Sequence, residues 1–242
     1  MSEVGWSEIA EWYDAHLRSG RTPHAVAADT VLALAGDVRG RRVLDVGCGQ
    51  GSATRALARA GALVTGTDSS SEMLAAARRH EDEQPLGIDY LRADGQDLSP
   101  LADESFDLVT CQLALMDIPD LDAVLVAVRR VLRPGGAFVA VISHPCFLAP
   151  FAQTVSLLDG RPARVVHEYL REQFWRSTNP EGVRRAGTYH RTISTYVNAL
   201  TRHGFALEEA MEPPASGEHA EQSPVYRQVP IFFGFRAAHS GW

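Results

Sequence analysis

Residues 42–58 constrain the fold of this chain more than any other stretch, because a strand, a glycine-rich turn and a helix follow one another there without a gap. The apolar, β-branched run at 43–46 is typical of a strand buried on both faces. Three glycines then form a turn without side chains: Gly47, Gly49 and Gly51. Ser52 opens a helical pattern, and such a helix N-terminus leaves backbone N–H groups free to bind a ligand.

The spacing of these glycines argues against binding of a nicotinamide dinucleotide. The dinucleotide fingerprint is Gly-x-Gly-x-x-Gly, but here the third glycine comes one residue early. Ser52 stands where the fingerprint has glycine or alanine, and Asp45 comes two residues before the turn. For this stretch taken alone, an ordinary connection between a strand and a helix is the alternative.

The composition limits the partners and the location that we expect. The 242 residues suffice for one α/β domain with an insertion, and the net charge of -7 argues against a nucleic-acid partner. The sequence has no apolar run long enough to span a membrane and no signal-peptide pattern. Its three cysteines form no disulfide framework, which suits a reducing compartment. We therefore expect a cytoplasmic protein without a membrane partner.

An acidic residue ends the second predicted strand. The strand at 62–67 leads into Asp68, and Ser69 with Glu72 three residues later fits the start of a capped helix. One carboxylate at this position can accept hydrogen bonds from both hydroxyls of a ribose. Asp68 is therefore a candidate for binding a nucleoside.

The rest of the chain continues the alternation of strands and helices. Asp120 can cap a helix that runs to about residue 132, and Thr192 can cap another. Further strands are predicted at 88–92, 106–111, 137–143, 205–212 and 229–236.

Several stretches, taken in order, resemble the motifs of class I S-adenosylmethionine-dependent methyltransferases. They are the glycine turn, Asp68 after the second strand, Asp94-Gly95 after the third, Gln112 after the fourth, and Leu132-Arg133-Pro134-Gly135-Gly136 before the fifth. The resemblance covers residues 43–140 well. It implies an α/β fold with a doubly wound, seven-stranded, mostly parallel sheet. The last strand would be antiparallel, helices would precede the sheet, and a lid insertion would follow strand five.

The resemblance also implies a site for S-adenosylmethionine. Asp68 matches the acid that binds the ribose, and Met73 is similar to the apolar residue that packs on the adenine. In related enzymes a tyrosine from an N-terminal helix covers the cofactor, and Tyr13 is similar to it. The cofactor residues that we predict are Tyr13, Asp45, Gly47, Cys48, Gly49, Gly51, Asp68, Ser69, Met73, Asp94, Gly95 and Gln112.

We predict one methyltransferase domain over residues 1–242. Its parts are a helical cap (1–40), a cofactor-binding core (41–144), a lid or substrate insertion (145–190), and a C-terminal helix and hairpin (191–242). In the cap, Ser7 can start a helix that runs to about Arg18, and Pro23 can start a second helix that ends before Gly36. In the insertion we expect a helix at about 163–176.

The residues that act on the methyl acceptor should follow strands four and five. His144 directly follows the fifth strand, at the sheet edge where α/β proteins bind ligands, and Pro145 restricts its backbone. We predict His144 as a general base or orienting residue, with Tyr189 and His190 able to share that role. A histidine that only bonds its own loop is the alternative. The predicted acceptor-binding residues are Trp12, Met116, Asp117, Tyr169 and Trp175, with simple packing as their alternative.

These observations predict an enzyme that transfers a methyl group from S-adenosylmethionine to a carbon, nitrogen or oxygen atom of a small metabolite. An aromatic or heteroaromatic acceptor and natural-product tailoring fit the aromatic insertion. No metal is expected, because no histidine pair has a metal-binding spacing and the cysteines are dispersed. We expect a monomer or a homodimer. The alternatives are an RNA- or protein-directed methyltransferase, a binding protein without catalysis, and an NAD-dependent oxidoreductase.

Overall fold

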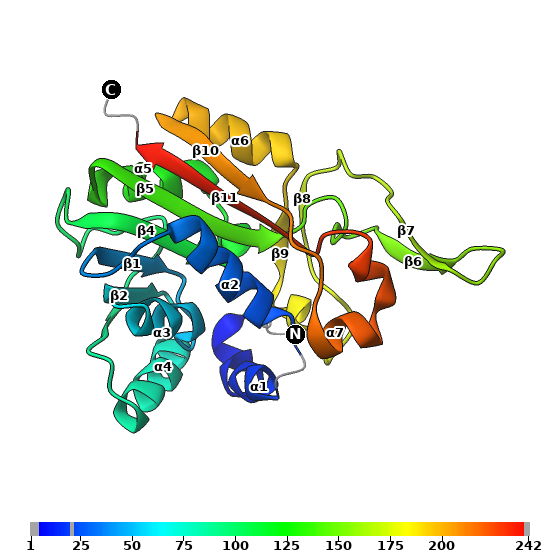
Figure 1. Ribbon diagram of the computed structural model, residues 1–242, viewed down its shortest axis with the longest axis horizontal. Helices are drawn as coiled ribbons and strands as arrows, with labels where there is room; N and C mark the ends of the chain where they lie inside the picture. The colour runs from blue at the N-terminus through cyan, green and yellow to red at the C-terminus, as the bar shows by residue number, and fades with distance from the viewer. Residues whose placement is uncertain (1–4, 20–21, 240–242) are drawn as a thin grey trace.

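A seven-stranded sheet forms the centre of the computed structural model, which describes residues 5–19 and 22–239 (Figure 1). The ends of the predicted cap and of the C-terminal part lie outside these residues. The strands lie in the order β10-β11-β5-β4-β1-β2-β3. Their bounds are β1 (Arg42–Val46), β2 (Leu63–Asp68), β3 (Asp89–Arg92), β4 (Phe106–Gln112), β5 (Leu132–Ser143), β10 (Phe205–Met211) and β11 (Phe232–His239). β11 runs antiparallel to both of its neighbours, β5 and β10, whereas the strands from β5 to β3 pair in parallel. The predicted doubly wound sheet with an antiparallel last strand is confirmed.

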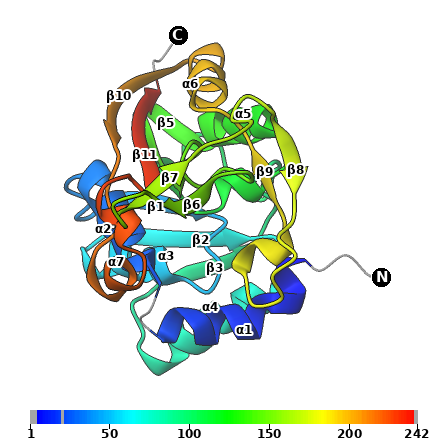
Figure 2. The same cartoon turned by 90° about the vertical axis from the view of Figure 1, so that its right-hand side faces the viewer.

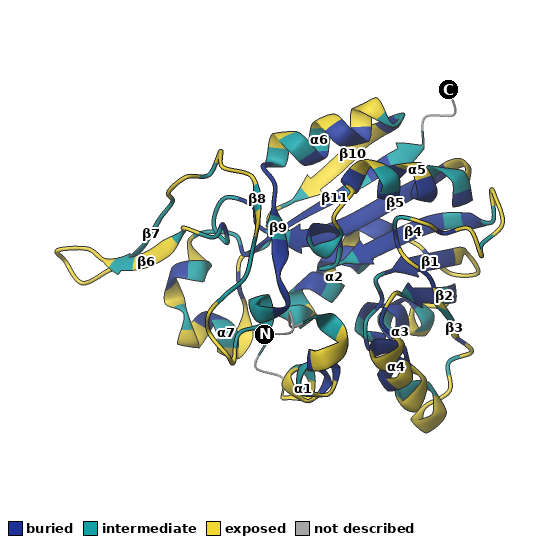
Figure 3. Cartoon of the chain, turned by 180° about the vertical axis from the view of Figure 1, so that it is seen from behind, coloured by how far each residue is buried: buried dark blue, intermediate teal, exposed yellow. Residues whose placement is uncertain are grey.

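Helices cover both faces of this sheet. Their bounds are α1 (Trp6–Arg18), α2 (His24–Ala35), α3 (Ser52–Arg59), α4 (Ser71–Glu83), α5 (Leu121–Val131), α6 (Ile193–Arg202) and α7 (Gly217–Gln222), with short 3-10 turns η1 (Leu115–Asp117), η2 (Val183–Ala186) and η3 (Pro224–Arg227). Along β5, Phe138 and Ala140 pack toward α5 and α6, and Val139 and Val141 pack toward α2 and α3. Because successive strand residues point to opposite faces, a continuous apolar run serves both cores. The central strands are accordingly buried (Figure 3). Over the residues described, no helix combines the length and the apolar character that crossing a membrane requires.

Two helices start at other residues than the sequence indicates. The Glu8 carboxylate accepts the Gly5 N–H at 2.6 Å, so α1 begins at Trp6, and the Ser7 hydroxyl donates instead to Ser70 Oγ. In α4 the N-cap is Ser70, whose hydroxyl oxygen accepts the Met73 N–H. The predicted cap at Ser69 is therefore wrong by one residue. The reason is that Asp68 accepts the Ser70 N–H at 2.9 Å, which forms a turn at the end of β2 and delays the helix.

The insertion after β5 contains two small hairpins where the sequence predicted a helix. β6 (Gln153–Ser156) pairs with β7 (Pro162–Val165), and β8 (Gln173–Trp175) pairs with β9 (Thr188–His190). The predicted helix at 163–176 is wrong because strand pairing satisfies both ends of that stretch, and Gly160 at a φ of 81° reverses the chain before it. Figure 2 shows both hairpins in front of the central sheet. The action of this insertion as a lid stays a prediction.

The C-terminal part follows the prediction more closely. Thr192 caps α6 by accepting the Thr195 N–H. Tyr189 and His190 precede this helix in β9, where they pair with β8. β11 begins three residues later than predicted, because the Ile231 N–H donates to the Pro213 carbonyl in the preceding connection.

Candidate active site

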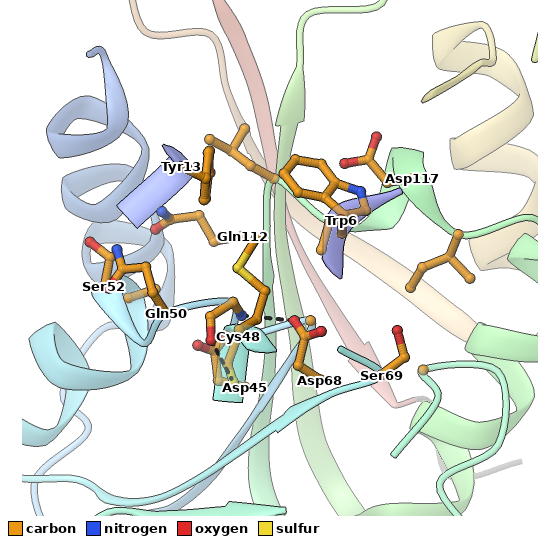
Figure 4. Close-up of a pocket in the computed structure, with 18 of the residues that line it drawn as sticks. Trp6, Tyr13, Asp45, Cys48, Gln50, Ser52, Asp68, Ser69, Gln112 and Asp117 are labelled. Carbon is orange, nitrogen blue, oxygen red and sulfur yellow. Dashed lines mark hydrogen bonds between the residues drawn. The ribbon is translucent and has the colours of Figure 1, made fainter. Parts of the chain in front are cut away.

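A cavity lies at the carboxyl ends of β1, β2 and β4, beneath α1 (Figure 4). Every residue predicted to bind the cofactor lines this cavity except Gly51. The cavity is also lined by Trp6, Leu17, His24, Gln50, Ser52, Ala53, Ala93, Leu113, Ala114, Asp117 and Ile118. Parallel strands place the residues that follow them along one edge of the sheet, so motifs far apart in the sequence meet here.

The three glycines of the turn have three different surroundings, although each has a positive φ. A Cβ on Gly47 would lie 2.5 Å from the Cβ of Ala114, and one on Gly51 would lie 2.4 Å from the Tyr90 hydroxyl. A Cβ on Gly49 would meet no protein atom within 4 Å, because Gly49 faces the open cavity. Gly47 and Gly51 thus allow close packing, and Gly49 leaves room for a ligand.

Asp68 is held in place by the backbone around it. Its Oδ2 accepts the Gly49 N–H and its Oδ1 accepts the Ser70 N–H, both at 2.9 Å. Burial raises the pKa of Asp68, and the N–H donors oppose that shift. Each carboxylate oxygen has a second lone pair, so Asp68 can still accept hydrogen bonds from a ligand in the cavity.

Asp45 connects three elements beneath the turn. Thr54 of α3 donates to one carboxylate oxygen at 2.7 Å, and Thr110 of β4 donates to the other at 2.8 Å. Burial raises the pKa of Asp45 to about 6, and the two hydroxyl donors oppose this shift. Its carboxylate is thus engaged with the protein on both sides.

Asp94 and Gly95 form the opposite end of the cavity. Asp94 is exposed, and its carboxylate accepts hydrogen bonds from the backbone and side chain of Gln96. A Cβ on Gly95 would lie 2.9 Å from Ile118 and 3.0 Å from Val46. Gly95 therefore lets the loop after β3 pack closely on Ile118 and on the end of β1.

Two buried oxygen atoms on the cavity wall have no partner among the described residues. They are Gln112 Oε1 and Asp117 Oδ2. The other oxygen of Asp117 accepts a hydrogen bond from Arg184 at 3.0 Å. Burial raises the pKa of Asp117 to about 6, against the opposing charge of Arg184. Since buried polar groups are normally hydrogen-bonded, these two atoms point to a polar ligand in the cavity.

Tyr13 and His24 form a hydrogen-bonded pair on the same wall. The Tyr13 hydroxyl and His24 Nε2 are 2.7 Å apart, and His24 Nδ1 is buried without a partner in the described chain. Burial, reinforced by the charges of His16 and Arg184, lowers the pKa of His24 to about 4. His24 is therefore neutral near pH 7. Sequence reasoning missed both His24 and Arg184, because only the tertiary fold brings them to the cavity.

A second cavity, of about 630 Å³, adjoins the first. The two share wall residues Trp6, Tyr13, His24 and Leu113. The insertion and the C-terminal part add apolar residues to its lining: Leu148, Ala149, Pro150, Ala152, Trp175, Val183, Ile231 and Phe232. Its volume is in the range typical of small-molecule sites.

The predicted catalytic residues lie around a third, much smaller cavity of about 30 Å³. His144, Tyr189 and His190 line it together with Met116 and Trp175. The backbone N–H groups of Cys146 and Phe147 donate to His144 Nδ1, so Nε2 carries the proton and donates to Glu212 at 2.8 Å. Burial lowers the pKa of His144, against the opposing effect of Glu212. Both ring nitrogens thus bond to the protein.

The remaining predicted residues contact other side chains. His190 Nε2 bonds to the Tyr169 carbonyl at 2.8 Å, and the Tyr169 hydroxyl accepts the Ile193 N–H at the start of α6. Trp12 stacks on His16 and lies under the guanidinium of Arg185. Trp12 and Tyr169 line none of the three cavities. Within the described ranges, no group of three or more His, Cys, Asp or Glu side chains could hold a metal ion.

Comparison with known proteins shows that the chain is similar to methyltransferases. The family model described as a methyltransferase domain matches residues 44–140. The chain is 36% identical over 120 residues to the ubiquinone biosynthesis O-methyltransferase of Aeromonas salmonicida, covering 49% of this chain and 50% of that protein. It is 35% identical over 140 residues to the protein of that name from Actinobacillus pleuropneumoniae, covering 56% and 58%. The chain thus spans about half the length of the curated relatives it matches, and their names give no support to natural-product tailoring.

Solved structures extend the similarity over most of the chain. A SAM-dependent methyltransferase from Methanosarcina mazei matches with a TM-score of 0.61 and 23% identity, covering 83% of this chain and 92% of that one, which shows the shared fold alone. An S-adenosylmethionine-dependent methyltransferase from Mesorhizobium loti matches with a TM-score of 0.72 and 31% identity, covering 90% of this chain and 98% of that one. Since the sequence similarity spans nearly the whole Mesorhizobium loti chain and the family motifs converge on one cavity, this chain belongs to the family of S-adenosylmethionine-dependent methyltransferases.

Proposed function

We propose that this protein transfers the methyl group of S-adenosylmethionine to an oxygen atom of a small, apolar, ring-bearing acceptor. The observation that carries the proposal is the shared wall of the two cavities, because methyl transfer needs two ligands side by side. The curated relatives are named O-methyltransferases, which supports oxygen as the acceptor atom. The size and the largely apolar lining of the second cavity favour a small molecule over RNA or protein as the acceptor.

The residues of the first cavity fit the parts of the cofactor. Asp68 binds the ribose hydroxyls, Asp94 and Gly95 bind the adenine edge, and Met73 packs on its face. The Gly49 backbone and the unpartnered Gln112 Oε1 face the amino-acid end of the cofactor. When bound, S-adenosylmethionine supplies a methyl group on a positively charged sulfur. The protein therefore contributes chiefly by holding the acceptor in line with that methyl group, which can supply about 7–11 kcal/mol.

Asp117 is the residue that takes the proton of the acceptor hydroxyl in this proposal. Its Oδ2 is unpartnered, and Arg184 holds its other oxygen and itself lines the second cavity. A pKa of about 6 for Asp117 suits a base that acts near neutral pH. His144 fits this role less well, because both of its ring nitrogens bond to the protein.

Cofactor binding is tested by Asp68→Asn. The variant loses a charge that accepts hydrogen bonds at both oxygens, and charge-assisted bonds are worth roughly 1.5–3 kcal/mol. Isothermal titration calorimetry with S-adenosylhomocysteine should show affinity weakened by about tenfold or more. Asp89→Asn removes an exposed carboxylate from the neighbouring strand and should leave the affinity unchanged. Heat from a nicotinamide dinucleotide but none from S-adenosylhomocysteine would overturn the proposal.

Proton transfer is tested by Asp117→Asn. With labelled S-adenosylmethionine and the best acceptor in a panel of hydroxylated aromatic compounds, the wild-type kcat should fall as the pH drops below about 6, where Asp117 becomes protonated. The variant should lose this acidic limb and be slower by roughly 100-fold or more. Its affinity for S-adenosylhomocysteine should change little. If kcat of the variant still falls below about pH 6, another residue takes the proton of the acceptor. If the wild type binds S-adenosylhomocysteine but methylates no acceptor in the panel, the protein is a binding protein without catalysis.

A further inference from the structure

The second cavity has an unusual balance of charge for this protein. The chain carries a net charge of -7, yet none of the described residues that line this cavity is an aspartate or a glutamate. Its ionisable lining consists of two arginines, three histidines and two tyrosines: Arg164, Arg184, His16, His24, His219, Tyr13 and Tyr226. Burial lowers the pKa of His24, and His16 and Arg184 lower it further.

The two arginines differ in how their charges are balanced. Arg184 forms an ion pair with Asp117, so its charge is compensated. Arg164 donates from Nε to the Phe147 carbonyl at 2.7 Å and from Nη1 to the Thr154 hydroxyl at 3.2 Å. Both acceptors are neutral, and no described residue accepts a hydrogen bond from Arg164 Nη2. A half-buried guanidinium thus faces an apolar cavity with one donor nitrogen free.

Arg164 is also held in a fixed orientation. Its guanidinium lies over the Tyr226 ring, 5.5 Å from the centroid, and the His219 ring stacks nearly parallel to Tyr226 at 5.9 Å and 16°. These residues come from β7, η3 and α7, and Figure 2 shows β7 and α7 near one another. We call Arg164, Tyr226 and His219 the Arg164 wall. A planar cation whose two other nitrogens are already bonded loses little freedom when it binds an anion.

We propose that the Arg164 wall binds a carboxylate on the methyl acceptor, so that the substrate is an apolar, ring-bearing carboxylic acid. The proposal rests on the proposed function, because it assigns the second cavity to the acceptor. The carboxylate pairs with the free Nη2 of Arg164, the ring system fills the apolar lining, and the reacting hydroxyl lies toward Tyr13 and His24 at the shared wall.

The test uses matched fluorescent probes of the same shape, 1-pyrenebutyrate and 1-pyrenebutanol, titrated into protein saturated with S-adenosylhomocysteine. The wild type should bind the acid about tenfold or more tightly than the alcohol. Quenching of tryptophan fluorescence reports the location, since Trp6 and Trp175 line the cavity. Arg164→Gln should abolish the preference for the acid and leave the affinity for the alcohol within about twofold.

The control variant is Arg161→Gln in the same hairpin. Arg161 is exposed, pairs with Asp159 and does not line the cavity, so its loss changes the net charge by the same amount and leaves the cavity lining intact. The preference for the acid should survive in this variant. Equal binding of both probes to the wild type, no binding of either, or equal losses in the two variants would each overturn the proposal. Calorimetry with S-adenosylhomocysteine on the same samples separates the two ideas, because intact cofactor binding leaves the proposed methyl transfer standing.

Discussion

Asp45 and Asp68 are carboxylates at the carboxyl ends of neighbouring strands, Asp45 fully buried and Asp68 partly buried, and their partners differ. Asp68 bonds only to backbone N–H groups beside the open cavity, and Asp45 bonds to hydroxyls from two other elements. The first arrangement orients a carboxylate toward a ligand, and the second joins β1 to α3 and β4. Both acids lie at or near the end of a strand, but Asp68 is placed to bind a ligand and Asp45 stabilises the fold.

Asp45→Asn should change how stability depends on pH. The folded-state pKa of Asp45 is about 6 and its ordinary value is 3.8, so the native state binds the extra proton between pH 4 and 6. The free energy of unfolding therefore falls as the pH rises through this window, by about 2–3 kcal/mol for this group. Asparagine does not titrate, and its amide can accept from one threonine and donate to the other.

Urea unfolding of the wild type and Asp45→Asn at pH 4.5 and pH 7.5 measures this difference. The variant should gain stability relative to the wild type at the higher pH. Asp45→Ala serves as the control, because it leaves the Thr54 and Thr110 hydroxyls without their partner and should destabilise by about 2–4 kcal/mol at pH 4.5. Alanine does not titrate either, so this loss should shrink by about 2 kcal/mol at pH 7.5. If the free energy of unfolding changed equally with pH in the wild type and in Asp45→Asn, burial would not raise the pKa of Asp45, and the prediction would be wrong.

At the scale of elements, two glycines of the turn between β1 and α3 serve different purposes: Gly51 allows close packing and Gly49 leaves room for a ligand. Gly51→Ala should destabilise the fold by about 2–3 kcal/mol, since it adds strain at a φ of 90° and a clash with Tyr90. Gly49→Ala should cost only about 1 kcal/mol, but its methyl group enters the cavity and should weaken S-adenosylhomocysteine binding tenfold or more. Urea unfolding and calorimetry on both variants check this. The opposite pattern would mean that Gly51 faces the ligand.

The insertion shows where local pattern and tertiary pairing disagree. Residues 163–176 carry apolar side chains at helical spacing, but Val165 and Trp175 sit in strands whose partners lie elsewhere in the insertion. Short apolar runs are compatible with either structure, and pairing with a neighbouring strand decides between them. The hairpins bring Arg164 and Trp175 to the second cavity, which a helix over these residues would not do in the same way.

At the scale of the whole molecule, the central sheet supplies the cofactor cavity, and the insertion with the C-terminal connection supplies most of the acceptor cavity. Residues 154–164 can therefore be replaced by Asn-Gly, which closes a two-residue hairpin between the paired Gln153 and Val165. No residue of β6 or β7 is buried, so the free energy of unfolding should change by only about 1 kcal/mol.

This shortened protein should keep its affinity for S-adenosylhomocysteine and lose its preference for 1-pyrenebutyrate, because Arg164 is removed and the cofactor cavity is not touched. Urea unfolding, calorimetry and the fluorescence titration together measure the three quantities. A loss of cofactor binding in a folded protein would show that the hairpin supports the first cavity as well.

The sequence by itself determined the central sheet, the edge where ligands bind and the residues around the first cavity. Those features depend on local signals: apolar runs specify buried strands, glycines specify the turn, and residues directly after parallel strands meet at one edge. The cap errors at Ser7, by two residues, and at Ser69, by one, arose because the Glu8 and Asp68 carboxylates accept backbone N–H groups that a local pattern assigns elsewhere. Only the tertiary structure decided the second cavity, the Arg184 pair with Asp117, and the hydrogen bonds that occupy both nitrogens of His144. These contacts join residues 67 and 68 positions apart, and no spacing in the chain encodes which distant side chains will meet.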